Sequence, residues 1–213
     1  MATVEERGDG RTVQLNNVRL VFTDSLKEAR STVENGEPKH TCTVLLEADK
    51  PETEANKKKV IAAIEAACER EWKKKDAWKA IAENDPKRVA FRKGERFKNK
   101  DGEVYAGFAG NYALAVSGPM GGKKRPKILN RHKQAVAVDD ILDVVYPGTY
   151  ADVVVSLYGT NKGGKGVFAS VNGIRSRERG ERVGGGVDVD ADDFDDLDDD
   201  DDLIKGESDD DLL

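Results

Sequence analysis

The stretch that decides the fold spans residues 150–175 and reads YADVVVSLYGTNKGGKGVFASVNGIR. Apolar side chains occupy alternate positions in both halves, at Val153, Val155 and Leu157 and then at Val167, Ala169 and Val171. A period of two is typical of a strand with one buried face. The glycine-rich residues 159–165 between the two runs are typical of a hairpin loop. The sequence therefore predicts a strand pair over residues 150–158 and 166–175.

The opposite face of this strand pair carries aromatic side chains. Tyr150, Tyr158 and Phe168 have the parity that points away from the valines, because successive side chains of a strand alternate between its two faces. A hairpin also brings cross-strand neighbours together. We therefore expect Tyr158 and Phe168 to lie close together on the face opposite the valines.

Three more strands are predicted on either side of a helical segment. They span residues 12–23, 39–47 and 111–117, each with alternating apolar positions. In the first strand, Asn16-Asn17 shifts the phase of the alternation, and this predicts a β-bulge.

One long helix is predicted over residues 51–83. Asp49 and Pro51 suit its start, and Asp85-Pro86 suits its end. Its apolar residues are spaced by three or four, at Ile61, Ile64, Cys68 and Trp72. Several short strands with one helix predict a mainly β fold, arranged as a small barrel or strongly bent sheet rather than repeated βαβ units.

The charge of the chain is divided unevenly. The 213 residues carry a net charge of −6, but residues 187–213 alone hold fourteen Asp and one Glu against one Lys, a net of −14, which leaves +8 for the rest. A basic body with an acidic tail indicates nucleic-acid binding and an interaction tail. We expect a folded domain over residues 1–183 and a disordered acidic tail over 184–213, joined at Gly184-Gly185-Gly186.

Several classes of protein are excluded on composition. Neither a bilayer-spanning apolar stretch nor a signal pattern is present, so we expect a cytoplasmic protein without membrane contact. Cys42 and Cys68 are isolated, and two histidines lack an evident nucleophile or metal partner. The sequence thus predicts no metal site, no cofactor and no enzymatic activity. Residues 159–166 approach a phosphate loop, but Gly166 stands where Ser or Thr must reach magnesium.

Two basic segments favour a single-stranded nucleic acid as the partner. Residues 119–133 contain six basic residues and no acidic one, and residues 91–108 alternate aromatic side chains with cations. Cations contact phosphates, and exposed rings stack on unpaired bases, whose faces a duplex hides. A merely solvated loop is the alternative for residues 119–133.

The predicted DNA-binding residues are cations and aromatics from these segments and from the hairpin. They are Arg92, Lys93, Arg96, Phe97, Lys98, Tyr105, Phe108, Lys123, Lys124, Arg125, Lys127, Arg131, Lys133, Tyr150, Tyr158, Lys162, Lys165, Phe168, Arg175 and Arg177. A given aromatic residue is more often part of a core than of a binding surface. We therefore expect only two or three of the six rings to contact DNA.

Four motifs carry a resemblance to a known family. They are YPGTY at 146–150, SLYGTN at 156–161, GGKGV at 163–167 and NGIR at 172–175. Through them the chain resembles, over residues 12–182, a family of tailed-bacteriophage single-stranded DNA-binding proteins formerly catalogued as a domain of unknown function. The resemblance implies an OB-like Greek-key barrel that coats exposed strands in phage DNA replication, recombination or repair, in the cytoplasm of the infected bacterium.

The end of the chain resembles the recruitment tip of replicative single-strand binders. Its acidic and apolar residues are Phe194, Asp209, Asp210, Asp211, Leu212 and Leu213. The resemblance implies partners among replication or recombination proteins, and the charge of the tail lets it compete with DNA for the basic body.

Two alternatives remain open at the level of sequence. An adaptor or DNA mimic would act through its acidic tail without affinity for oligonucleotides, and an RNA-binding module would use the same stacking and phosphate contacts. The sequence also leaves open whether the protein forms a homo-oligomer.

Overall fold

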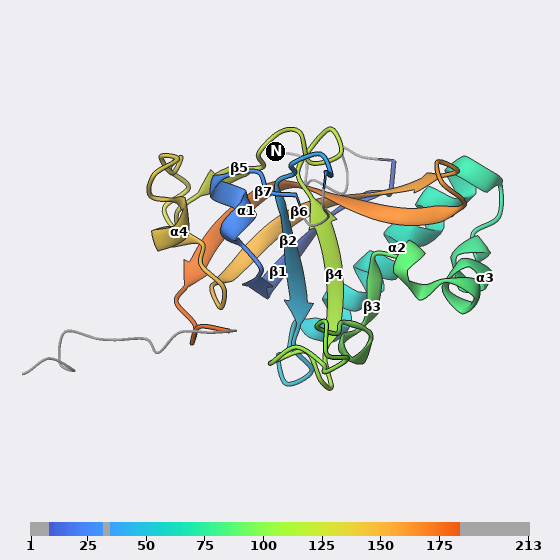
Figure 1. The fold of residues 1–213 in the computed structure, drawn as a ribbon, viewed down its shortest axis with the longest axis horizontal. Helices are drawn as coiled ribbons and strands as arrows, with labels where there is room; N and C mark the ends of the chain where they lie inside the picture. The colour runs from blue at the N-terminus through green and yellow to red at the C-terminus, as the bar shows by residue number, and fades with distance from the viewer. Residues whose placement is uncertain (1–8, 32–34, 184–213) are drawn as a thin grey trace, which may run out of the picture.

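A computed structural model describes residues 9–31 and 35–183 of the protein (Figure 1). The strands are β1 (Thr12–Val21), β2 (Thr41–Leu46), β3 (Phe91–Lys93), β4 (Tyr112–Ser117), β5 (Lys127–Leu129), β6 (Tyr150–Thr160) and β7 (Gly166–Glu178). The helices are α1 (Asp24–Lys27), α2 (Thr53–Trp72), α3 (Ala77–Asn84) and α4 (Ile141–Val144), with short 3-10 turns η1 (Pro86–Arg88) and η2 (Gly94–Arg96). The chain is mainly β, as predicted.

Five strands close into a barrel in the order β4-β2-β1-β6-β7. Each neighbouring pair is antiparallel, and β7 returns to β4 through a parallel pairing at Ser117 and Ser170. The edge strand β3 pairs antiparallel with β4, and the other edge strand, β5, pairs parallel with β7. This arrangement is consistent with an OB-like fold, a five-stranded Greek-key barrel.

The hairpin that decides the fold forms as predicted. Tyr158 pairs with Phe168, and β6 and β7 are longer than expected, reaching Thr160 and Glu178. The predicted apolar face is buried inside the barrel: Val153, Val155, Leu157, Val167, Ala169 and Val171. Burial of this apolar face fixes the register, because a slip by one residue would expose every one of these side chains.

The bulge predicted at Asn16-Asn17 is confirmed. The register between β1 and β6 shifts between Leu15 and Val18, and Asn17 has a φ of 50°. Asn56 of α2 holds the bulge: its side-chain amide donates to the Asn16 carbonyl at 2.7 Å, and its Oδ1 accepts from the Asn16 N–H at 3.1 Å. The extra residue is therefore satisfied by a helix instead of a neighbouring strand.

The single helix predicted over residues 51–83 is wrong, because the chain forms two helices there. Lys73 adopts a left-handed conformation with a φ of 57°, and its N–H donates to the Glu69 carbonyl at 3.0 Å. The run of lysines at 73–75 provides no apolar side chain for the buried face, so nothing favours continuing the same turn. A new helix then buries Ile81. Among the described residues, none of the helices is long and apolar enough to cross a bilayer.

Two apolar clusters stabilise the fold. The larger cluster fills the barrel and includes the buried face of α2, which packs mainly on β6 and β1. The smaller cluster consists of Val21, Leu45, Phe108 and Ala113, with Phe97, Val104 and Val183 packed on it. Val183 also donates its N–H to the Pro147 carbonyl at 3.0 Å. The predicted acidic tail, including Phe194 and Asp209 to Leu213, lies outside the described residues, and the division at residue 183 stays a prediction.

Candidate nucleic-acid interface

A groove of about 980 Å³ crosses the outside of the barrel. Its floor comes from β2 and β4, whose outward side chains there are Thr41, Thr43, Ala115 and Ser117. Their neighbours Cys42, Val44, Leu114 and Val116 point inward to the core, since successive side chains of a strand alternate between its faces. Small floor residues leave room for planar groups to lie against the backbone.

One side of the groove carries the aromatic pair predicted from the hairpin. The ring centroids of Tyr158 and Phe168 lie 6.3 Å apart with 41° between the ring planes, and both side chains are half-buried. Burial raises the pKa of the Tyr158 hydroxyl, although its hydrogen bond with Ser117 acts in the opposite direction. The hydroxyl therefore stays neutral at physiological pH and does not repel a phosphate.

A second aromatic pair lies across the β2–β4 floor, where Phe22 follows β1. Phe22 is 43% exposed and Tyr105 is 37% exposed, with ring centroids 4.9 Å apart in an edge-to-face arrangement. Phe108 supports both rings from below, at 5.7 Å from each. Phe22 has a φ of 55°, a conformation that costs a bulky residue about 1–3 kcal/mol.

Four cationic residues line the groove: Arg30, Lys39, Arg88 and Lys162. Arg30 and Lys39 come from the two arms of the β1–β2 connection, which are joined by backbone hydrogen bonds in both directions, at 3.1 and 2.9 Å. Among the described lining residues, Asp24 is the single carboxylate. The groove therefore combines four half-exposed or exposed rings with an excess of positive charge.

A thiol lies at the edge of this surface without contributing to its charge. Cys42 lines the groove but is only 3% exposed. Burial raises the pKa of its thiol to about 12. The Cys42 side chain is therefore neutral at physiological pH and belongs to the core beneath the floor.

The structure brings together four of the predicted DNA-binding residues. Tyr105, Tyr158, Lys162 and Phe168 line the groove, and Lys165 lines an adjoining cleft between the β6–β7 loop and α3. Tyr105 is distant in sequence from the hairpin residues. They line the same groove because the parallel pairing of β4 with β7 closes the barrel.

Phe108 is wrong as a DNA contact, because it is fully buried in the smaller apolar cluster. Phe97 packs beside it at 5.3 Å between centroids, and the Arg92 guanidinium lies 4.1 Å from the Phe97 centroid. Burial lowers the pKa of Arg92, with Asp85 acting in the opposite direction. Lys93, Arg96 and Lys98 are exposed around β3 and η2 and do not line the groove. Of the predicted residues in this segment, only Tyr105 lines the groove.

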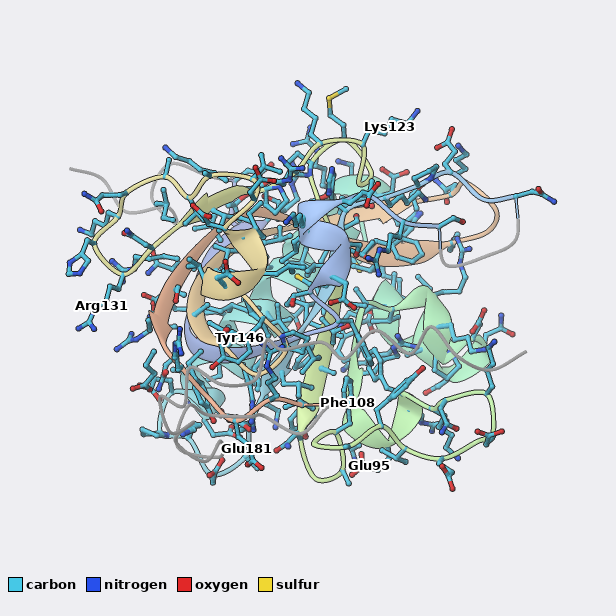
Figure 2. The ribbon with its side chains drawn as sticks, turned by 60° about the vertical axis from the view of Figure 1, so that its left-hand side comes forward. Glu95, Phe108, Lys123, Arg131, Tyr146 and Glu181 are labelled. Atoms are coloured by element: carbon cyan, nitrogen blue, oxygen red, sulfur yellow. The ribbon has the colours of Figure 1, made fainter. Side chains whose placement is uncertain are left out.

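The six cations of residues 119–133 do not line the groove, to which this segment contributes Gly121. Figure 2 shows Lys123 and Arg131 on separate loops that project in different directions. Arg125 donates to the carbonyls of Leu26 and Lys27 at 2.8 and 2.5 Å, and Lys123 pairs with Glu37 at 3.7 Å. The remaining cations of this segment are exposed: Lys124, Lys127, Arg131 and Lys133.

Tyr150, Arg175 and Arg177 belong to a different surface, the Asp152 cluster, which also contains Arg19, Glu47 and Asp152. Asp152 accepts from Arg175, from Arg177 at 3.1 Å and from the Asn17 N–H at 3.0 Å. Tyr150 donates to Glu47 Oε2 at 2.7 Å, and Arg19 pairs with Glu47 Oε1 at 2.8 Å. Because carboxylates accept these hydrogen bonds, the three predicted residues stabilise the fold and do not line the groove.

The sequence reasoning missed Phe22, Arg30, Lys39 and Arg88. In the sequence, Phe22 continues the alternation of Val18 and Leu20, which are buried, but its left-handed backbone turns it outward. The cations on the β1–β2 connection carried no periodic signal. Within the described part of the chain, no group of three or more His, Cys, Asp or Glu side chains is placed to hold a metal.

Comparisons with known proteins agree on one relationship. A family model described as the single-stranded DNA-binding protein of Enterobacter phage Enc34 matches residues 11–204. Protein p50 of Acyrthosiphon pisum secondary endosymbiont phage 1 is 30% identical over 187 residues, which cover 87% of this chain and 93% of that protein.

Two solved structures of the bacteriophage Enc34 single-stranded DNA-binding protein share the fold. The structure in complex with single-stranded DNA has a TM-score of 0.65 and 20% identity, with 82% of this chain and 90% of that chain covered. A second structure of the same protein has a TM-score of 0.61 and 21% identity, with 86% and 89% covered. At this identity the likeness is one of fold.

Proposed function

The chain belongs to the family of the Enterobacter phage Enc34 single-stranded DNA-binding protein, and from this premise we propose that it binds single-stranded DNA, largely without sequence preference, in the groove across β2 and β4. The observation that carries the proposal is the meeting of two aromatic pairs and four cations over a floor of small side chains. The role is that of a non-enzymatic coat on exposed strands.

Base stacking is the contribution to the binding free energy that favours single strands over a duplex. Each base stacked on an aromatic side chain contributes about 1–3 kcal/mol, and every base offers such a face. The Tyr158–Phe168 pair and the Phe22–Tyr105 pair come from different elements that line the same groove, so two bases or more can stack at once. The neutral Tyr158 hydroxyl adds no repulsion.

Phosphate contacts supply the second term. Arg30, Lys39 and Lys162 in the groove and Lys165 in the adjoining cleft give four sites for phosphates. If all four are used, log affinity falls against log salt concentration with a slope of roughly −3. A slope near zero would contradict the electrostatic part of the proposal.

The test titrates oligo-dT against the full-length protein and its Tyr158→Ala and Phe168→Ala variants. We expect each variant to weaken binding by about 1–3 kcal/mol without unfolding the protein. Tyr112→Ala is the matched control, because Tyr112 and Phe91 form another half-buried ring pair, 5.5 Å apart, that does not line the groove. Unchanged affinity in both groove variants would refute the stacking assignment.

The acidic residues 184–213 are proposed to compete with DNA and to recruit replication or recombination proteins. Val183 packs in the cluster of Phe108, and Phe108 contacts Tyr105. Val183, the last described residue, therefore lies close to the aromatic rim. Attachment at this point would give the net charge of −14 in residues 187–213 a high effective concentration near the groove cations. Truncation after Val183 is expected to tighten DNA binding, and weaker binding would refute competition.

Oligo-U and duplex DNA complete the test of ligand class. Equal affinity for oligo-U would favour an RNA-binding module. Absence of oligonucleotide binding, together with full partner binding by residues 184–213 alone, would favour the adaptor or DNA mimic. Roles in phage replication, recombination or repair in the host cytoplasm follow from strand coating.

A further inference from the structure

The loop at the tip of the β6–β7 hairpin, residues 161–165, is held from outside the hairpin. We propose that Arg88 is a positioning residue that orders this loop and the Phe168 ring for DNA, and that it acts through the protein and not as a phosphate contact. The inference rests on the proposed function and names the residue that prepares its site.

Arg88 uses its guanidinium on the protein backbone. Nε donates to the Lys165 carbonyl at 3.0 Å, and Nη2 donates to the carbonyls of Lys162, at 3.0 Å, and Gly164. The Arg88 Cζ also lies 5.4 Å from the Phe168 ring centroid. One side chain therefore fixes the backbone of both predicted phosphate-binding lysines and one face of a predicted stacking ring.

The loop is built to wrap around this guanidinium. Gly163 and Gly164 have φ values of 66° and 102°, which favour glycine. A side chain added at Gly163 would lie 3.7 Å from Arg88 Nη1, and one added at Gly164 would lie 3.9 Å from Arg88 Cζ. The two glycines thus let the carbonyls turn toward Arg88.

The residues after Arg88 tie its backbone to the groove. The Ala90 N–H donates to the Val167 carbonyl of β7 at 2.8 Å, and the Ala90 carbonyl accepts from the Ala115 N–H of β4 at 3.0 Å. This segment lies between the hairpin and the floor, so the position of Arg88 is fixed relative to both.

The end of α2 supports the other side of the loop. Trp72 Nε1 donates to Asn161 Oδ1 at 2.9 Å, and the Asn161 amide donates to Glu71 Oε1 at 2.8 Å. Figure 1 shows the hairpin tip beside the end of α2. Order that exists before binding removes an entropic cost of association, because side chains and loops need not be immobilised by the ligand.

Arg88→Lys separates positioning from phosphate contact, because lysine keeps the charge and loses the planar fork that serves three carbonyls. We expect Arg88→Lys and Arg88→Ala each to weaken oligo-dT binding about tenfold, the size expected when two or three side chains are ordered only on binding. Both variants should keep the salt slope of the unmodified protein. Lys87→Ala, which removes a neighbouring exposed charge, should bind as the unmodified protein does.

A phosphate contact predicts a different pattern. Affinity close to the unmodified value in Arg88→Lys, or a salt slope shallower by about 0.7 in Arg88→Ala, would overturn the positioning role. If the unmodified protein does not bind oligo-dT, the proposed function fails. If it binds and Tyr158→Ala weakens it while Arg88→Lys does not, only the positioning role fails.

Hydrogen exchange provides a measurement without DNA. The amides of residues 161–166 are expected to exchange faster in Arg88→Lys than in the unmodified protein, and unchanged rates would overturn the inference. Should Arg88→Lys not fold, Asn161→Ala removes the support from α2 instead. It should speed exchange in the same loop and weaken oligo-dT binding about threefold, and no change in either would overturn the inference.

Discussion

The groove and the Asp152 cluster each combine a tyrosine on the outside of β6 with arginines or lysines, but the partners of these cations differ. In the Asp152 cluster, Asp152 and Glu47 accept hydrogen bonds from the cations and the tyrosine. In the groove, Asp24 is the single carboxylate among the described lining residues, and rings remain partly exposed. The comparison teaches that the partner of a cation, more than its residue type, separates a stabilising surface from one available to a ligand.

Removing the central carboxylate should produce the largest effect on stability. Asp152 is 5% exposed and accepts from two arginines and a backbone N–H. Asp152→Ala is expected to lower the free energy of unfolding by about 3 kcal/mol, at the lower end for a buried ion pair because both arginines are partly exposed. Urea denaturation measures this, with Asp139→Ala, an exposed carboxylate, as control. A large loss of DNA affinity in the folded variant would break the comparison.

The groove side of the comparison is sharpened by Tyr105→Ala. Tyr105 is exposed and rests on Phe22 and Phe108. The variant should lose about 1–3 kcal/mol of oligo-dT binding free energy, with little change in unfolding midpoint. Val138→Ala, another exposed apolar residue, serves as control. A stability loss equal to that of Asp152→Ala, without loss of affinity, would place Tyr105 with the structural residues.

Acid should act on the Asp152 cluster through the same carboxylate. Burial opposes ionisation of Asp152, but the hydrogen bonds from Arg175, Asn17 and Arg177 outweigh it and lower its pKa. A lowered pKa in the folded state gives stability that is complete above the unfolded value of about 3.9 and is lost as the pH falls through the folded value. The stability difference between the unmodified protein and Asp152→Ala should therefore shrink below about pH 4. A constant difference down to pH 2 would contradict this assignment.

The smallest expected effect is on the salt dependence. Lys162→Gln should make the slope of log affinity against log salt shallower by about 0.7, the contribution of one phosphate on a single strand. Arg177→Gln should leave the slope unchanged, because Arg177 already pairs with Asp152. Equal changes in both variants would mean that the ion pair opens to bind DNA.

Local patterns in the sequence predict what depends on local geometry. The two-residue period of the hairpin, the bulge at Asn16-Asn17 and the pairing of Tyr158 with Phe168 were all confirmed. The extent of the helix was not, because Lys73 turns left-handed where the apolar stripe runs out. The sequence did not predict Phe22 as a groove residue for a related reason. Strict alternation would put its side chain on the buried face of the first strand, but its positive φ turns the side chain outward.

The partners of the cations depend on tertiary contacts and could not be predicted. Arg175 and Lys162 are both cations of the hairpin region, and the sequence predicts the same DNA-binding role for both. In the structure, Asp152 accepts a hydrogen bond from Arg175, whereas Lys162 lines the groove. Arg125 similarly donates to the carbonyls of Leu26 and Lys27 at the end of α1, which are 99 and 98 residues away in the sequence. A basic segment therefore predicts that the chain is positively charged there, but it does not predict which groups the cations will contact in the fold.

The closure of the barrel has a consequence for the order in which the protein assembles. β1 pairs with β6, and the side chains of Thr12 and Ser156 hydrogen bond across 144 residues of sequence. Contacts of such separation slow folding, because a long loop must close before they form. The side of the groove that carries Tyr158 and Phe168 comes from β6 and β7, the last two strands of the chain. A nascent chain that has not yet released them from the ribosome therefore has no complete surface to offer a nucleic acid.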